Sequence, residues 1–167
     1  MPCSPNKINE FVEVLSHRVK EIIRAMGFGG LLKLKAKELN RKATVWLMDI
    51  FNPNKMKLQI GGGKEITVDE FAVSCVFGLP NAGVDPPLLT DTIRNEGAEI
   101  WKELSKKLYG VEKAITVTSL KEMIRKKEIN DDLALRCFFM VAFSNLLYTN
   151  TESIIWISDV VWTEDIG

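Results

Sequence analysis

The 167-residue sequence has little of what enzymes most often use, with one histidine, three cysteines and no excess of charge of one sign. Lysine plus arginine and aspartate plus glutamate each number 22, so no net field attracts the chain to nucleic acid or to an anionic membrane. Cys3, Cys75 and Cys137 are far apart and form no CxxC pair. With His17 as the single histidine, they do not make a zinc-ligand pattern. The sequence therefore predicts no metal site and no cofactor.

Long apolar runs are also missing. The longest, near Cys137 to Leu147, is interrupted by Ser144 and Asn145 and is too short to cross a bilayer. The amino terminus, "MPCSPNKINEFVEV", has early acidic residues and lacks the apolar segment of a signal peptide, and it is no transit peptide either. The odd, dispersed cysteines favour a reducing compartment. We expect a nuclear or cytoplasmic protein without membrane contact and without an evident small-molecule ligand.

Helical periodicity accounts for most of the chain. Apolar residues at helical spacing predict a first helix from Ile8 to Met26, ended by Gly27. Other helices are expected over Arg41–Phe51, after the Thr67–Glu70 pair with its capping-box spacing, after Asp91, after Ser119 and after Asn130. The last of these, "LALRCFFMVAFSNLLY", is apolar almost all round, which is typical of a helix in the middle of a core.

The stretch "LQIGGGKEIT" predicts a β-hairpin. A three-residue turn, Gly61–Gly63, sets Leu58 opposite Ile66 and places the apolar residues on one face. A phosphate-binding loop needs GxxxxGK followed by Ser or Thr and then a helix, whereas a second strand follows these glycines. The predicted fold is mostly α, a compact helical bundle of about six or seven helices with one small two-stranded β-hairpin.

Nucleophilic catalysis needs a Ser, Cys or Thr beside a base that a third group orients. His17 lies off the apolar stripe of its helix and is expected at the surface, while Cys75 lies between apolar residues and is expected in the core. HExxH and GxSxG motifs do not occur. The sequence therefore predicts a protein that is not an enzyme, and a hydrolase with an unrecognised site is the last alternative.

Two segments are candidates for binding. The first is a possible basic patch, formed by Lys33, Lys35, Lys37, Arg41 and Lys42. Such a patch would give weak, salt-dependent binding to nucleic acid; solvated lysines without a ligand are the alternative interpretation.

The second candidate is the apolar segment near the end of the sequence. Its possible partner-binding residues are Ile154, Ile155, Trp156, Ile157, Val160, Val161 and Trp162. Aromatic anchors are enriched at binding hot spots, which favours an interface with a protein partner or a second copy of the chain. The alternative is that the segment folds back onto the domain's own core.

The order of several short motifs resembles the plant mobile domain, also known as the aminotransferase-like domain, which transposon-derived plant genes carry. The motifs are Ser4-Pro5, Met26-Gly27-Phe28-Gly29, Leu31-Leu32, Trp46-Leu47, Phe51 to Pro53, Ile66-Thr67 with Phe71, Phe77-Gly78-Leu79-Pro80, and the later "DDLALRCFFMVAFSNLLYTNTE" with "VVW". In many relatives this domain lies upstream of an Ulp1-like protease, whose histidine and cysteine do not occur here. A pyridoxal-phosphate lysine site is not recognisable either.

The resemblance implies one domain over residues 1–167, shorter at its carboxyl end than the family and with Leu147–Asn150 where relatives often have a proline. It implies a non-enzymatic protein-interaction module of transposon origin in a plant, such as a gene-silencing factor or a component of a selfish genetic element. A nucleic-acid-binding accessory domain is the alternative.

Overall fold

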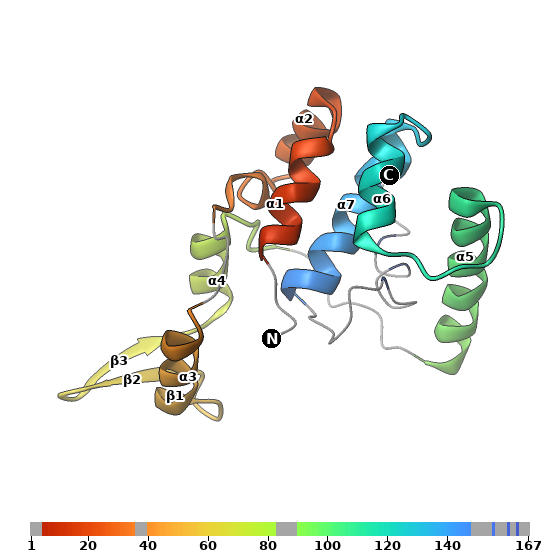
Figure 1. Cartoon of the computed structure of the whole chain (residues 1–167). Helices are drawn as coiled ribbons and strands as arrows, with labels where there is room; N and C mark the ends of the chain where they lie inside the picture. Colours follow the sequence, from red (N-terminus) through yellow and green to blue (C-terminus); the bar gives the residue numbers. More distant parts are fainter. Residues whose placement is uncertain are drawn as a thin grey trace.

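The computed structural model describes residues 5–35, 40–82, 90–147, 155, 160 and 163, and most of these residues are helical (Figure 1). The helices are α1 (Pro5–Val14), α2 (His17–Ala25), α3 (Arg41–Ile50), α4 (Glu70–Phe77), α5 (Asp91–Tyr109), α6 (Val117–Arg125) and α7 (Asp131–Ala142). A 3-10 turn, η1 (Leu31–Lys33), follows α2, and a π-helical segment, η2 (Phe143–Leu147), continues α7. The prediction of a mostly helical fold with about six or seven helices is confirmed for the described residues, which form seven.

The hydrophobic core surrounds α7. Nine of its twelve residues are buried, and α1, α2 and α6 all pack against it. Asn130 begins the helix, since its side chain accepts a hydrogen bond from the Leu133 amide, and Asp131 and Asp132 place negative charge in the first turn. The central position predicted for this apolar helix is confirmed. Phe138, in its middle, is fully buried and meets the ring of Phe139 edge to face.

The first predicted helix is two helices in the structure. Ser16 interrupts it, because this residue is extended (φ −63°, ψ 158°) and its hydroxyl oxygen accepts a hydrogen bond from the Val19 amide as the cap of α2. The same hydroxyl donates to a carboxylate oxygen of Asp131 at 2.9 Å, which links the break to the start of α7. The apolar stripe was read correctly; the serine that interrupts it was missed.

Polar contacts fasten α5 to α6 through the loop between them. The Ser105 hydroxyl donates to the Lys113 carbonyl and accepts from the Lys113 amide, and Tyr109 and Ser119 share a hydrogen bond of 2.5 Å. Leu104 and Leu108 of α5 belong to the buried core. These contacts attach α5 to the same bundle as α1, α2, α6 and α7.

The sheet is antiparallel, in the order β1 (Phe51–Asn52), β2 (Lys57–Gly61) and β3 (Lys64–Thr67). Leu58 pairs with Ile66, as the hairpin register predicts, and the three turn glycines have positive φ angles of 87°, 59° and 75°. Two details differ from the prediction. Gly61 pairs with Lys64 across a tighter turn, with an irregularity between Gln59 and Gly61, and β1 adds a third strand that was too short to predict.

Candidate functional site

Residues 40–82, which comprise α3, the sheet and α4, form a unit here called the hairpin lobe; in Figure 1 α3 and the sheet project away from the bundle around α7. No residue of the hairpin lobe is buried. Its exposed large apolar side chains are Val45, Trp46, Leu47, Met48, Met56, Ile60, Ile66, Phe71, Val73 and Val76. Scattered apolar residues are normal on protein surfaces, but ten in one small unit are a concentration that sets the hairpin lobe apart from the bundle.

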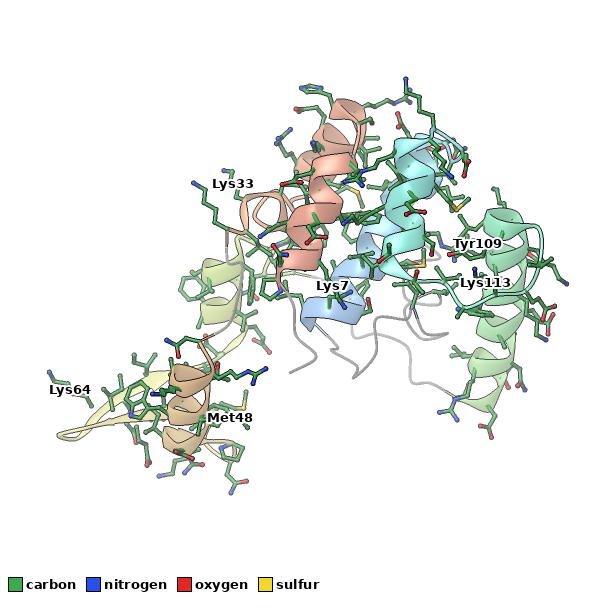
Figure 2. All side chains as sticks on the ribbon, in the orientation of Figure 1. Lys7, Lys33, Met48, Lys64, Tyr109 and Lys113 are labelled. Atoms are coloured by element: carbon green, nitrogen blue, oxygen red, sulfur yellow. The ribbon has the colours of Figure 1, made fainter. Side chains whose placement is uncertain are left out.

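Helix α3 begins and ends with ordinary signals. The Asn40 side chain accepts a hydrogen bond from the Ala43 amide at 3.1 Å, and the chain becomes extended at Phe51. What is unusual is its apolar content, because Val45 to Met48 are four consecutive exposed apolar residues. At 3.6 residues per turn, four consecutive residues cover almost the whole circumference. Figure 2 labels Met48 on this helix, which has no buried residue.

The sheet has one polar and one apolar face. The Lys57 ammonium lies 2.6 Å from a Glu65 carboxylate oxygen across the polar face, and this hydrogen bond lowers the pKa of Glu65. Leu58 and Ile66 pair across the other face, and α3 packs on β2. Even so, Ile66 stays half-exposed, so the helix and sheet together cover only part of the lobe's apolar surface.

Helix α4 is capped by Asp69, whose carboxylate accepts a hydrogen bond from the Ala72 amide at 2.8 Å. The predicted start of the helix is confirmed, but Asp69 provides the cap instead of the predicted Thr67. Gly78 ends the helix in the left-handed conformation (φ 61°), and the Ser74 hydroxyl donates to the Leu79 carbonyl at 2.6 Å. Phe71, at 66% exposure, projects from the first turn.

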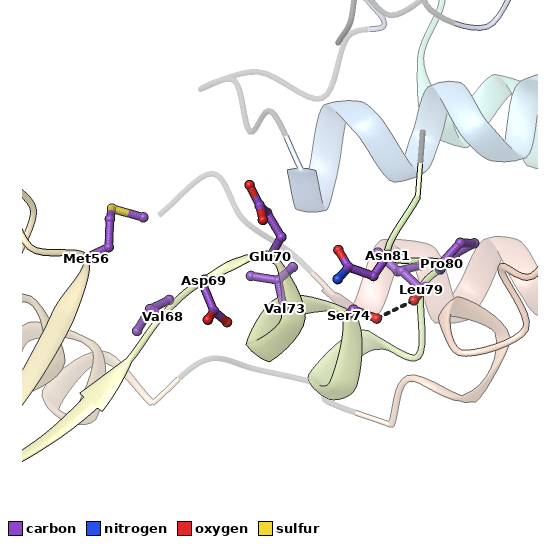
Figure 3. A pocket seen from close by; sticks show the side chains of 9 residues that line it. All are labelled: Met56, Val68, Asp69, Glu70, Val73, Ser74, Leu79, Pro80 and Asn81. Carbon is purple, nitrogen blue, oxygen red and sulfur yellow. Dashed lines mark hydrogen bonds between the residues drawn. The ribbon is translucent and has the colours of Figure 1, made fainter. Parts of the chain in front are cut away.

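A pocket of about 510 Å³ lies between α4 and the base of the hairpin (Figure 3). It is lined by Met56, Val68, Asp69, Glu70, Val73, Ser74, Leu79, Pro80 and Asn81. The walls are largely apolar, with two carboxylates at the start of α4. Its volume lies in the range of ligand sites, roughly 300–1,000 Å³, and its shape can also receive a large side chain from another protein.

Close backbone contact joins the end of α4 to the bundle. A Cβ added at Gly30 would overlap the carbonyl oxygen of Phe77, and one added at Gly27 would lie 2.8 Å from a Pro80 carbon. Phe77 and Leu79 are partly buried against the core. The glycine-rich bend after α2 is therefore where the hairpin lobe meets the bundle, and the only residue that fits at position 30 is glycine.

The apolar segment predicted as a partner site is described at two of its seven residues. Ile155 and Val160 are fully buried members of the core. The Ile155 amide donates to the Ile115 carbonyl at 2.9 Å, and the Trp101 indole donates to the Ile155 carbonyl at 3.1 Å. At Ile155 and Val160 the structure therefore agrees with the alternative interpretation, in which the segment packs on the domain's own core. Ile154, Trp156, Ile157, Val161 and Trp162 lie outside the described residues, so their role stays a prediction.

The predicted basic patch is described at four of its five residues. Lys33 and Lys35 lie in and just after η1, and Arg41 and Lys42 lie in the first turn of α3; all four are exposed. Lys37 lies outside the described residues. Positive charge in the first turn of a helix opposes the helix dipole, so Arg41 and Lys42 do not stabilise α3 in this way. Their exposure is compatible both with weak binding to nucleic acid and with solvated side chains that have no ligand.

The two cysteines that the structure describes and the histidine lie on separate elements. His17 is exposed at the start of α2, as predicted, with Nε2 3.5 Å from Glu21. Cys137 of α7 is fully buried, and burial raises the pKa of its thiol to about 12. Cys75 of α4 is exposed, so its predicted place in the core is wrong. The apolar neighbours of Cys75 suggested burial, but α4 lies in the hairpin lobe, where Val73 and Val76 are themselves exposed.

Among the residues that the structure describes, no cluster of three or more His, Cys, Asp or Glu side chains could hold a metal ion. None of the described helices has the length and apolar character needed to span a membrane.

The described part of the protein is mostly helical. Its small antiparallel sheet belongs to the hairpin lobe, which exposes large apolar side chains and has no buried residue. The family model described as "Domain of unknown function (DUF8566)" matches residues 1–166, and the chain belongs to this family. No curated protein and no solved structure matches the chain.

Sequence reasoning missed the hairpin lobe as a site. The signal was present, because Val45–Met48 are four consecutive apolar residues and most residues of α4 are apolar. That pattern predicts burial, and Cys75 of α4 was expected in the core for this reason. The structure shows them at the surface of the chain.

Proposed function

We propose that the protein is a non-enzymatic protein-interaction module and that the hairpin lobe is its contact surface. One observation carries the proposal: residues 40–82 fold into two helices and a sheet without burying a single residue. Ordering a residue's backbone costs about 1–2 kcal/mol, and burial of apolar surface is the main term that offsets this cost in a folded domain. Because the hairpin lobe buries little apolar surface within itself, it gains this favourable free energy by packing against a partner.

The kind of surface supports a protein partner. Trp46 is half-exposed, and tryptophan is among the residues most enriched at the energetic centres of protein interfaces. Methionine adapts to irregular partner surfaces, and Met48 and Met56 are both exposed here. In contrast, the basic residues of the lobe are balanced by acidic ones, which does not favour nucleic acid as the main ligand.

The biological setting of the module is proposed from the family resemblance. Transposon-derived plant domains of this kind suggest a module that works in gene silencing or in a selfish genetic element. Such roles need binding rather than catalysis. They agree with the positions of His17, Cys75 and Cys137 on three separate elements, α2, α4 and α7.

A comparison of two exposed apolar residues tests the proposal. Phe71→Asp places a charge on the hairpin lobe, and Val111→Asp places the same charge on a residue that is 61% exposed between α5 and α6. Both variants should fold, because neither side chain contributes to the core. Proteins bound from an extract of the source tissue would be compared by quantitative mass spectrometry for wild type and both variants.

We expect a set of bound proteins that Phe71→Asp reduces at least tenfold and Val111→Asp leaves within twofold of wild type. Equal binding by all three proteins would contradict the assignment of the hairpin lobe as the contact surface. Specific turnover of a substrate by the purified chain would contradict the non-enzymatic part of the proposal.

A further inference from the structure

We infer that the hairpin lobe packs against the hairpin lobe of a second copy of this chain, so that the protein is a symmetric homodimer. This inference rests on the proposed function, since it names the partner of the same surface. It follows from the area, the charge and the shape of the lobe.

The exposed apolar area matches what one side of a stable interface buries. A large side chain that is half-exposed presents on the order of 100 Å², so ten of them present on the order of 1,000 Å². One side of a standard interface buries about 800 Å², and permanent homodimer interfaces resemble a domain core cut in half. Both descriptions fit a lobe that exposes this much apolar surface and has no buried residue.

The charges of the lobe suit self-association. Residues 40–82 contain five basic and four acidic residues, so two copies repel each other little when they meet. The basic pair Arg41 and Lys42 begins α3, and the acidic pair Asp69 and Glu70 lies at the start of α4. A partner selected by charge would instead require an excess of one sign on the lobe. The full sequence, with formal net charge +0, adds no repulsion.

Shape supports the same partner. A two-fold interface uses the same patch on both copies, so the patch needs projecting parts and a hollow that receives them. The hairpin lobe has both. Met48 of α3 and Phe71 of α4 project, at 68% and 66% exposure. The pocket walled by Val68 and Val73 provides the hollow in the same lobe.

Sedimentation equilibrium of the full chain tests the inference over roughly 1–100 µM protein, the range in which micromolar association is measured. Wild type should be a dimer, and Phe71→Asp should weaken dimerisation at least tenfold. Met48→Asp, on the other helix of the lobe, should do the same, and Val111→Asp should change it less than twofold. Circular dichroism would check that each variant keeps the helical content of wild type; if one aspartate variant fails this check, the other decides.

The outcomes separate this inference from the proposed function. A wild-type monomer over the whole range overturns the homodimer, as does a dimer that neither aspartate variant weakens. If wild type is a monomer but tissue proteins still bind it in a Phe71-dependent way, the lobe is an interaction surface for a different protein and the proposed function stands. If wild type is a monomer and that binding is also missing, both proposals fail.

Discussion

Helices α7 and α3 both contain runs of apolar residues, but their surroundings are opposite. The runs are Cys137 to Ala142 in α7 and Val45 to Met48 in α3. Nine residues of α7 are buried by neighbouring helices, whereas none of α3 is buried. Such a run predicts that a helix will be covered, but it does not say whether the cover comes from the same chain. In this protein the bundle supplies its own cover, and the hairpin lobe exposes the surface on which we propose a partner packs.

The largest expected effect comes from removing the last segment of the bundle. Ending the chain at Glu152 deletes Ile155 and Val160, which are both fully buried. Each buried aliphatic side chain contributes roughly 1.5–3 kcal/mol, so the free energy of unfolding should fall by about 3–6 kcal/mol. Because domains are stable by only about 5–15 kcal/mol, thermal denaturation followed by circular dichroism should lose its cooperative transition.

A substitution at Arg136 weakens the attachment of the same segment without shortening the chain. Arg136 donates to the Val160 carbonyl at 3.2 Å, so Arg136→Met removes the attachment while keeping an apolar stem on α7. This variant should melt cooperatively at a lower temperature than wild type. A truncated chain that melts like wild type would mean that Ile155 and Val160 do not stabilise the bundle.

The next effect compares two phenylalanines. Phe138→Ala should cost about 3–5 kcal/mol because it leaves a cavity in the core. Phe71→Ala should cost less than about 0.5 kcal/mol in dilute protein, as at other exposed sites. Urea denaturation at low protein concentration measures both. In concentrated protein, Phe71→Ala should become more destabilising, since dimerisation stabilises the wild type by mass action. If both substitutions lower the free energy of unfolding equally in dilute protein, the bundle and the hairpin lobe do not differ in burial as described.

How far the sequence predicts this molecule depends on which interactions are local. Asn130 before α7 and the glycines at the hairpin turn act within a few residues, and the structures that they predict are confirmed. The break at Ser16 was missed, because the sequence alone does not show whether a serine within an apolar stripe continues the helix or caps a new one. Burial was the least predictable property. Cys75 was expected in the core from its neighbours, whereas its exposure depends on where all of α4 packs.

A smaller effect concerns the junction between the two regions. Gly30→Ala should lower the free energy of unfolding by about 1–3 kcal/mol, because the new Cβ would overlap the Phe77 carbonyl oxygen. Gly29→Ala is the matched control, since the nearest atom to its Cβ would be a side-chain carbon of Arg24, at 3.4 Å. Thermal melts of both variants measure the difference. If Gly30→Ala is as stable as Gly29→Ala, the end of α4 does not pack on the bundle as closely as the structure shows.

The smallest effect is a pH dependence within the bundle. Lys121 of α6 donates a hydrogen bond to the Glu10 carboxylate of α1, and this bond lowers the pKa of Glu10 from its ordinary value of 4.5. A carboxyl whose pKa is lower in the folded state stabilises the fold above its unfolded pKa, and the contribution is lost as the pH falls through the folded pKa. The Glu10 side chain is 44% exposed, so solvent screening limits the pair to about 0.5 kcal/mol.

Glu10→Gln should therefore reduce stability slightly at pH 7 and have no effect in acid below both pKa values, as measured by urea denaturation across that range. Glu65→Gln is the control from the hairpin lobe, where Lys57 likewise lowers the pKa of a carboxyl. Because the Lys57–Glu65 pair joins neighbouring strands of a lobe without buried residues, its loss should change global unfolding less than the loss of the Glu10–Lys121 pair, which joins two helices of the bundle. A larger effect from Glu65→Gln would show that the lobe unfolds together with the bundle, and α3 and α4 would then draw their stability from within the chain.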